Sequence, residues 1–163
     1  MPKPERQRSE LIGEVIIGMP RAGYPHEITK SNANRALTDW SLQHPDWRVF
    51  CETAYQLDDR NCLIPDLSVD SGRVVPGSSG VFQGAPEVAI EVVSSESASR
   101  LNDKIELYLS HHGKSVWVIY PKQRTIRIFD AGGGAARFRE DQPLFDPNLP
   151  GFSVPTSAIF EGV

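Results

Sequence analysis

Two acidic residues, Asp66 and Glu91, each stand inside an apolar segment with the alternation of a strand. In the segment Leu63–Asp70 the even-numbered positions share one face, so Asp66 points away from the most apolar side. In the segment Pro86–Ser94, Glu91 shares a face with Ala89. Each strand therefore presents one carboxylate from the middle of an apolar run.

Two carboxylates brought together in a partly buried place repel each other unless a cation or a proton lies between them. Magnesium resolves this conflict because it takes oxygen ligands and keeps waters available for chemistry. Between carboxylates and a phosphate, it polarises the phosphoryl oxygen and lowers the pKa of an attacking water. We therefore predict that Asp66 and Glu91 bind Mg²⁺ or Mn²⁺. In the alternative, both are strand-edge or surface acids that never meet.

A third candidate, Lys104, lies in the segment Ser97–His112, which has a helical period, Ser97 or Ser99 suited to cap its start, and Gly113 past its end. On a helical wheel Lys104 falls at the edge of the apolar stripe, partly exposed, where its ammonium could reach over the adjoining sheet. A lysine in that place could stabilise a pentavalent phosphate or orient the water. The alternative is a lysine whose stem covers apolar surface and whose charge stays in water.

Other residue types give weaker signals. Cys51 and Cys62 lack the CxxC spacing of a zinc site and are expected to be packed thiols. His26 lies at the start of a helical segment, while His111 and His112 lie at the end of another and are expected to serve its carbonyls and dipole. The sequence contains no nucleophile elbow, P-loop or dinucleotide fingerprint.

The elements that must position these residues follow from the pattern of apolar residues and turns. The order is strand, helix, three strands, helix and two strands, with a hairpin turn at 58–61 and a polar loop at 72–84. This order predicts a mixed β-sheet with flanking helices, α/β or α+β, in a single domain of residues 1–163. The expected elements are Leu11–Met19, His26–His44, Arg48–Leu57, Leu63–Asp70, Pro86–Ser94, Ser97–His112, Ser115–Tyr120 and Thr125–Asp130.

Composition narrows the class of protein. Hydrophobic residues make up 39% and charged residues 23%, as in a globular protein, and no run of apolar residues is long enough to span a bilayer. With two cysteines and no apolar segment behind the first charges, a cytoplasmic location is expected. The net charge is −4, yet residues 100–139 hold eight basic and three acidic side chains. Such a segment could contact a phosphate backbone or be an unevenly charged surface.

Six short motifs stand in this order along the chain: Glu10–Glu14, Ile64–Asp66, Ile90–Ser94, Asp103–Tyr108, Trp117–Pro121 and Leu149–Phe152. Together they resemble the Uma family, described as putative restriction endonucleases, within the PD-(D/E)XK nuclease superfamily. The resemblance implies a core of helix, three strands, helix and strand with the active site at one end of the sheet. Asp66 matches the aspartate of the PD motif, and Glu91 matches the acid of the third strand. Val93 stands where the wider superfamily has its lysine, and Lys104 matches the lysine that the Uma pattern places on the next helix.

The superfamily also implies a further glutamate at the site. Glu27, on the first helix, lies far from the middle of its apolar face, so we prefer Glu52, on the strand across the hairpin from Asp66. The chain is thus expected to be a metal-dependent DNA endonuclease that uses a magnesium-activated water. A homodimer would supply two sites, and the strand Thr125–Phe129 is expected to be exposed. It alternates Ile126 and Ile128 with basic residues and could pair or pack with its copy. The alternative is an inactive module of the same fold that binds nucleic acid or a partner protein.

Overall fold

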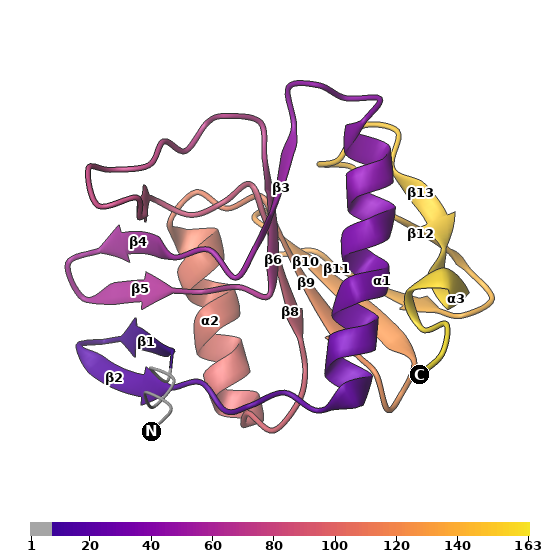
Figure 1. The fold of residues 1–163 in the computed structure, drawn as a ribbon, viewed down its shortest axis with the longest axis horizontal. Coiled ribbons are helices and arrows are strands. Elements are labelled where there is room, and N and C mark those ends of the chain that lie inside the picture. The colour runs from indigo at the N-terminus through magenta and orange to yellow at the C-terminus, as the bar shows by residue number, and fades with distance from the viewer. Residues whose placement is uncertain (1–7) are drawn as a thin grey trace, which may run out of the picture.

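A six-stranded mixed sheet forms the centre of the chain in the computed structural model, which describes residues 8–163 (Figure 1). Its strand order is β11-β10-β9-β8-β6-β3, and β8 and β9 are its only parallel neighbours among the described residues. The mixed sheet with flanking helices confirms the predicted fold class. The first seven residues, which formed part of the argument against a secretory signal, lie outside the described residues. The bounds are β3 Arg48–Cys51, β6 Leu67–Asp70, β8 Val88–Val92, β9 Ser115–Tyr120, β10 Thr125–Asp130 and β11 Ala135–Arg139.

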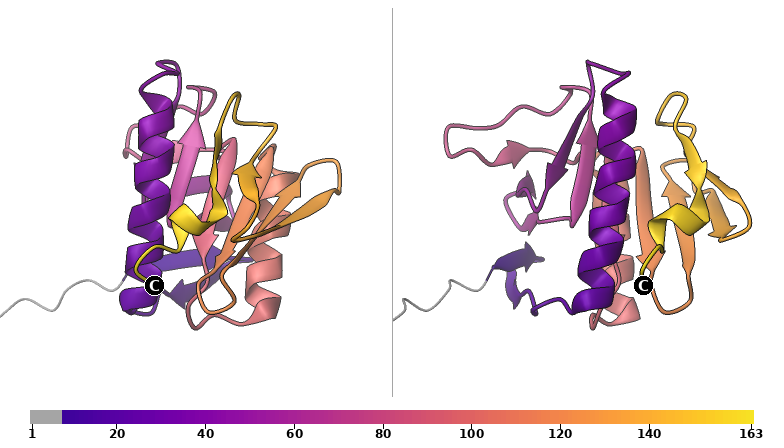
Figure 2. Two further views of the ribbon diagram at one scale, coloured as in Figure 1. Left: turned by 90° about the vertical axis from the view of Figure 1, so that its right-hand side faces the viewer. Right: turned by 45° about the vertical axis from the view of Figure 1, so that its right-hand side comes forward.

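The two long helices, α1 (Tyr24–Ser41) and α2 (Ala98–Ser110), lie on opposite faces of this sheet (Figure 2). Alternation along β8 explains both layers, because Ile90 packs in the cluster that contains α1 side chains and Ala89 packs in the cluster that contains α2 side chains. Every residue of β8 is buried. Glu91 therefore lies on a covered face, under α2.

Helix α2 connects the parallel strands β8 and β9 and begins where the sequence predicts. The Ser97 side chain accepts a hydrogen bond from the Arg100 N–H, at 3.2 Å, so Ser97 is the N-cap. At the other end, the Gly113 N–H donates to the Tyr108 carbonyl. A Cβ at position 113 would lie 2.6 Å from that carbonyl oxygen, which explains why glycine follows the helix.

The structure contains a second, five-stranded sheet, and the prediction of one strand over residues 11–19 was wrong. That segment is part of a hairpin, because Gly13 and Glu14 both have positive φ, 55° and 68°, as a two-residue hairpin turn requires. The sheet order is β2-β1-β5-β4-β7. Its strands are β1 Ser9–Ile12, β2 Val15–Gly18, β4 Tyr55–Asp58, β5 Asn61–Leu63 and β7 Phe82–Gln83.

The hairpin predicted over residues 48–70 has its turn in the expected place but divides between the two sheets. Its inner half, β4 and β5, belongs to the five-stranded sheet, while β3 and β6 belong to the central sheet. Glu52 lies at the first break with a positive φ of 47°. The chain therefore leaves the central sheet just beside Asp66, and an open end forms there.

The carboxyl-terminal part packs against α1 and adds elements beyond those predicted. The Asn32 side chain donates to the carbonyls of Ile159 and Glu161, at 3.1 and 2.8 Å. The added elements are the hairpin β12 (Pro143–Phe145) and β13 (Ser153–Pro155) and the short helix α3 (Thr156–Ile159). Within residues 8–163, no helix combines the length and apolarity needed to cross a membrane.

Strand β10 is not free to contact a second copy of itself, as was expected for a homodimer. It lies between β9 and β11, so both of its backbone edges are already hydrogen-bonded. Ile126 and Ile128, expected to be exposed, are buried. The structure therefore removes the reason given for pairing this strand with a second copy.

Candidate active site

Asp66 and Glu91 come together at one end of the central sheet. The antiparallel register of β6 and β8 pairs Leu67 with Ile90, and its continuation by one residue sets Asp66 opposite Glu91. The Val92 N–H donates to Asp66 Oδ2 at 2.7 Å, which fixes that carboxylate beside β8. Their exposed fractions are only 8% and 2%. The two acids predicted to meet thus lie on adjacent strands in a nearly buried place.

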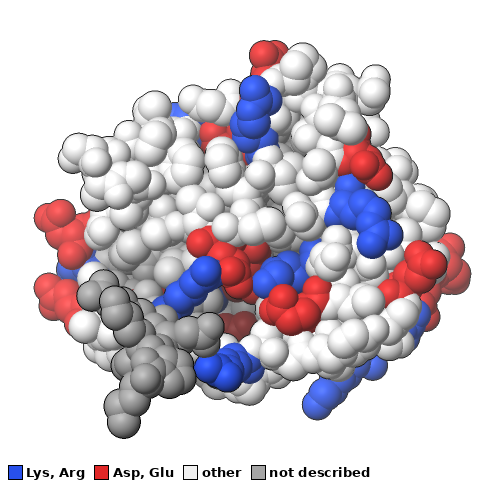
Figure 3. Space-filling view, viewed as in Figure 1, with Lys and Arg blue, Asp and Glu red and all other residues white. Residues whose placement is uncertain are grey.

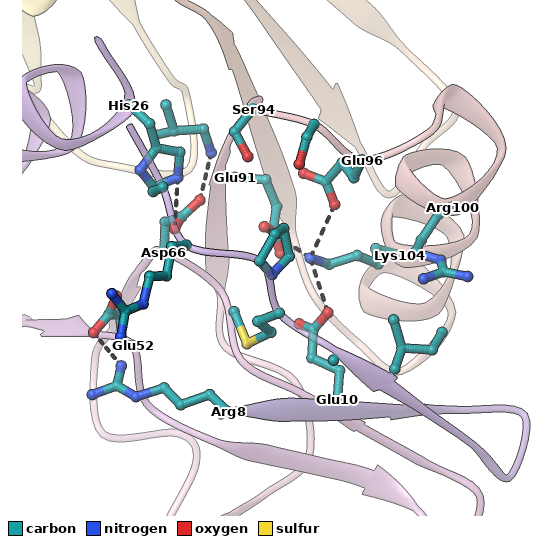
Figure 4. A pocket seen from close by; sticks show the side chains of 18 of the residues that line it. Arg8, Glu10, His26, Glu52, Asp66, Glu91, Ser94, Glu96, Arg100 and Lys104 are labelled. Carbon is teal, nitrogen blue, oxygen red and sulfur yellow. Dashed lines mark hydrogen bonds and ion pairs between the residues drawn. The ribbon is translucent and has the colours of Figure 1, made fainter. Parts of the chain in front are cut away.

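Lys104 reaches the same place from α2 (Figure 4). Its Nζ lies 3.0 Å from a Glu91 oxygen, 3.3 Å from Glu10 and 3.6 Å from Glu96. The lysine is 3% exposed, so the expectation of a partly exposed side chain was wrong. Burial alone would lower its pKa, but the three carboxylates outweigh burial and raise the pKa of Lys104. Lys104 is therefore held as an ammonium ion.

Glu91 lies where negative charge is crowded. Its Oε1 accepts from the Tyr108 hydroxyl at 3.0 Å, and its Oε2 contacts Lys104. Burial, helped by the charges of Asp66, Glu10 and Glu96, raises the pKa of Glu91 well above its ordinary range, and Lys104 opposes this rise. Burial likewise raises the pKa of Glu96. The four carboxylates outnumber the single ammonium ion, so added positive charge would stabilise them.

His26 is a site residue that the sequence interpretation treated only as a helix-start residue. Its Nε2 lies 3.1 Å from Asp66 Oδ1, and its Nδ1 lies 3.2 Å from Glu27 Oε1. Burial opposes protonation of the ring, but the hydrogen bonds and charges of these two acids outweigh burial and raise the pKa of His26. Both ring nitrogens face carboxylate oxygens, which suits the doubly protonated ring. Asp66 is therefore held from both oxygens, by His26 and by the backbone of β8.

Glu52 lies at the rim of the site and is held by cations. Arg8 contacts one of its carboxylate oxygens, and the Lys30 ammonium lies 3.1 Å from the other. Burial favours the neutral form, but Lys30 and Arg8 outweigh burial and lower the pKa of Glu52. The same Lys30 also contacts Glu27, at 3.1 Å. The two glutamates weighed as a further ligand thus share one lysine.

A cavity of about 1050 Å³ is lined by the acidic and basic side chains just described, namely Glu10, His26, Glu27, Glu52, Asp66, Glu91, Glu96 and Lys104. Figure 3 shows acidic and basic side chains crowded around the hollow between the β1–β2 hairpin and the start of α1. Arg100, exposed in the first turn of α2, and Arg21 add basic groups to the lining. Among residues 8–163, no Phe, Tyr or Trp side chain lines this cavity.

The chemistry of the donor set suits a hard divalent cation. Among residues 8–163 no group of three or more His, Cys, Asp or Glu side chains is arranged to hold a metal ion by itself. Mg²⁺ does not require such a cage, since it is usually bound by one or two carboxylates together with waters and substrate phosphates. Asp66 and Glu91, in a cluster with excess negative charge, fit that mode of binding.

The remaining candidates from the sequence lie away from this cavity. His111 caps the end of α2, with Nδ1 2.7 Å from the Leu107 carbonyl and Nε2 2.7 Å from Asp58. This arrangement confirms its expected role at a helix terminus. Cys51 is exposed and Cys62 is only half-buried, so the expectation of two packed thiols was wrong for Cys51. Sequence reasoning overlooked Glu10 and Glu96, although Glu10 begins the first motif of the family resemblance.

Comparison with known proteins gives two findings. A family model named Uma2, described as "Putative restriction endonuclease", matches residues 1–157. In addition, the fold is similar to the crystal structure of a putative nuclease belonging to DUF820 from Anabaena variabilis ATCC 29413, with a TM-score of 0.83. That match covers 98% of this chain and 93% of the other at 21% sequence identity, so it shows the fold alone. A search of curated proteins gives no match.

Proposed function

Because this chain belongs to the Uma2 family of restriction endonuclease-like proteins, we propose that its acidic cavity hydrolyses phosphodiester bonds of DNA with the help of a divalent cation. The single observation that carries the proposal is the cluster of Asp66, Glu91 and Lys104 in one cavity. Two carboxylates on adjacent strands with a buried ammonium ion are the groups that metal-assisted phosphodiester hydrolysis needs.

Asp66 and Glu91 would hold Mg²⁺ or Mn²⁺. A bound ion of this kind polarises the phosphoryl oxygen and lowers the pKa of the attacking water. The protein contributes orientation, because the Val92 N–H and His26 hold Asp66 and the Tyr108 hydroxyl holds Glu91. Carboxylates fixed in this way need little rearrangement when a ligand arrives.

Lys104 supplies the positive charge that faces the phosphate. Attack on a phosphodiester builds negative charge on the phosphoryl oxygens, and an ammonium ion fixed in a nearly dry place stabilises that charge. Glu10 and Glu96 lie 3.3 and 3.6 Å from Nζ and keep the ammonium in position. These two glutamates are therefore assigned a positioning role.

Glu52 remains a candidate for the catalytic set, with a role different from that of a primary ligand. Its carboxylate already binds Arg8 and Lys30 at the cavity rim. We assign it to the rim, where it holds these two cations beside the path of an incoming phosphate backbone. Loss of Glu52 should then alter substrate affinity more than the rate of hydrolysis.

Cutting both strands of a duplex calls for two active sites, which a homodimer would supply. The open edge strands of the two larger sheets in the described chain are β2, β7, β3 and β11, and the small sheet adds β12 and β13. A dimer contact could use one of these edges or a helix face. The compartment proposed is the cytoplasm, where the thiols of Cys51 and Cys62 would stay reduced. Light scattering at micromolar concentration measures the assembly directly.

The function is tested by incubating the protein with supercoiled plasmid and with single-stranded DNA, in Mg²⁺, in Mn²⁺ and in excess chelator. We expect nicked or linear product with either metal and none with chelator. A protein that binds DNA but cuts neither substrate in either metal would instead be an inactive module of the same fold.

A further inference from the structure

Three arginines share one exposed face of the hairpin formed by β10 and β11, at the outer end of the central sheet. The register sets Arg127 directly opposite Arg137 and sets Thr125 opposite Arg139, so Arg139 is diagonal to Arg127. All three arginines are exposed. The other face of the hairpin is apolar, with Ile126, Ile128 and Phe138 in the core.

This arrangement is electrostatically unfavourable in the protein alone. Residues directly opposite on antiparallel strands have Cβ atoms about 4.5–5.5 Å apart, and like charges there are destabilising. Within residues 8–163 no carboxylate forms an ion pair with any of the three arginines. The two acids next to the hairpin have other partners. Asp130 accepts from the backbone of Gly132 and Gly134, and Glu140 contacts Arg124 at 2.6 Å.

Tyr120, at the end of β9, holds one of these arginines in place. The Arg127 guanidinium lies 5.8 Å from the centre of the Tyr120 ring, a cation–π contact. The ring contacts the flat face of the guanidinium, so the N–H groups around its edge remain available as hydrogen-bond donors. An arginine held in this way is suited to bind a phosphate through two hydrogen bonds.

The arginine face lies on the same side of the sheet as the cavity. Arg127 is the register partner of Val118, and Val118 packs in the cluster that includes α2. Glu91, on β8, also lies on the α2 side, where it contacts Lys104. In addition, β8 and β9 are parallel, so Tyr120, at the carboxyl end of β9, lies at the same end of the sheet as the cavity. Exposed Arg100, in the first turn of α2, lines the cavity on this side.

We propose that Arg127, Arg137 and Arg139 form a phosphate-binding surface, separate from the cavity, that holds the backbone of a nucleic acid. Charge complementarity carries the proposal, because three neighbouring arginines without carboxylate partners match a row of phosphates. The choice of nucleic acid over other polyanions rests on the proposed function. The cavity itself is rich in carboxylates, so much of the affinity for a long substrate must come from outside it.

The test measures binding of a fluorescent DNA duplex by the full chain, using anisotropy over 50–200 mM salt without divalent metal. The variant is Arg127→Gln with Arg137→Gln, and the matched control is Arg35→Gln with Arg48→Gln, two exposed arginines on α1 and β3. Each phosphate contact contributes about 0.9 to the slope of log affinity against log salt. We expect the variant slope to be shallower by roughly 1.8, while the control keeps the wild-type slope.

Thermal unfolding separates binding from folding. Because Arg127 and Arg137 repel each other, the variant should unfold at the wild-type temperature or above it. A variant that keeps the wild-type salt slope would overturn the proposal, as would wild-type protein that binds vesicles of anionic lipid but no DNA. Since no cleavage is needed, a protein that binds DNA through these arginines yet never cuts it would sustain this inference while refuting the proposed function.

Discussion

Replacing Lys104 with methionine should destabilise the protein strongly. The ammonium is 3% exposed and contacts Glu91, Glu10 and Glu96. Removal of one partner from a buried ion pair costs about 3–5 kcal/mol, because the remaining charge is left uncompensated. For a chain of this size, each kcal/mol lowers the melting temperature by roughly 2–4 °C. The expected decrease is therefore roughly 6–20 °C at neutral pH.

The loss of stability caused by Lys104→Met should increase as pH rises. Glu91 and Glu96 have raised pKa values in the folded protein, and removal of Lys104 raises them further. Raised carboxyl pKa values make the folded state bind more protons than the unfolded state does, so its stability falls as pH rises from the unfolded value of about 4.3 through the folded value. The gap between variant and wild type should therefore be small near pH 5 and large near pH 8.

Two further variants make this expectation refutable. Lys114→Met should cost about 1 kcal/mol or less, since that side chain is 47% exposed. The double variant Lys104→Met with Glu91→Gln should recover part of the loss, because it also removes the closest carboxylate. Calorimetry at pH 5 and pH 8 measures all three. If Lys104→Met were as stable as wild type at pH 8, the buried cluster would be misassigned.

Lys104→Met should slow DNA cleavage by about 10²–10³-fold and Lys114→Met should not, when both are assayed at a temperature at which circular dichroism shows them folded. The pKa of His26 is raised in the folded protein, so its stabilising effect should be lost as pH rises from about 6.5 through that folded pKa. Wild type should therefore lose stability relative to His26→Gln over this range, and melting temperatures of the two proteins that change with pH in parallel would refute this. Gly113→Ala should cost about 1–3 kcal/mol in urea unfolding, because its Cβ would meet a backbone carbonyl oxygen at 2.6 Å, and an unchanged midpoint would contradict that contact.

Local rules predicted the elements whose signals are local. A serine cap before α2, the glycine after α2 and the bounds of β9 and β10 all follow from side-chain type and short-range pattern, whereas the choice of Ser97 over Ser99 came from the structure. The prediction of one strand over residues 11–19 was wrong because the β-branched residues of this segment lie on both sides of a two-residue turn and read as one continuous run. The split of the 48–70 hairpin depends on which sheet each half joins, and periodicity carries no information about that choice.

The site was predictable only where strand alternation decides it. Alternation placed Asp66 and Glu91 each on the less apolar face of its strand, and the pairing of adjacent strands brought the two carboxylates together. The burial of Lys104 could not be read from its own helix, because Glu10 reaches it from a hairpin far away in the sequence. His26 was missed for the same reason, since its contact with Asp66 joins α1 to β6. Long-range pairing of charges has no local signature.

The most direct test of the central claim compares plasmid cleavage by Asp66→Asn with cleavage by wild type and by Asp103→Asn. An asparagine oxygen can still accept from the Val92 N–H, so the fold should survive while the ligand charge is lost. Asp103 is exposed on the same helix as Lys104 and serves as the control. Loss of a partner that only supports a metal ligand already costs about 10–100-fold, so Asp66→Asn should be at least about 100-fold slower. Cleavage by Asp66→Asn at the wild-type rate would contradict the assignment of this cavity as the active site.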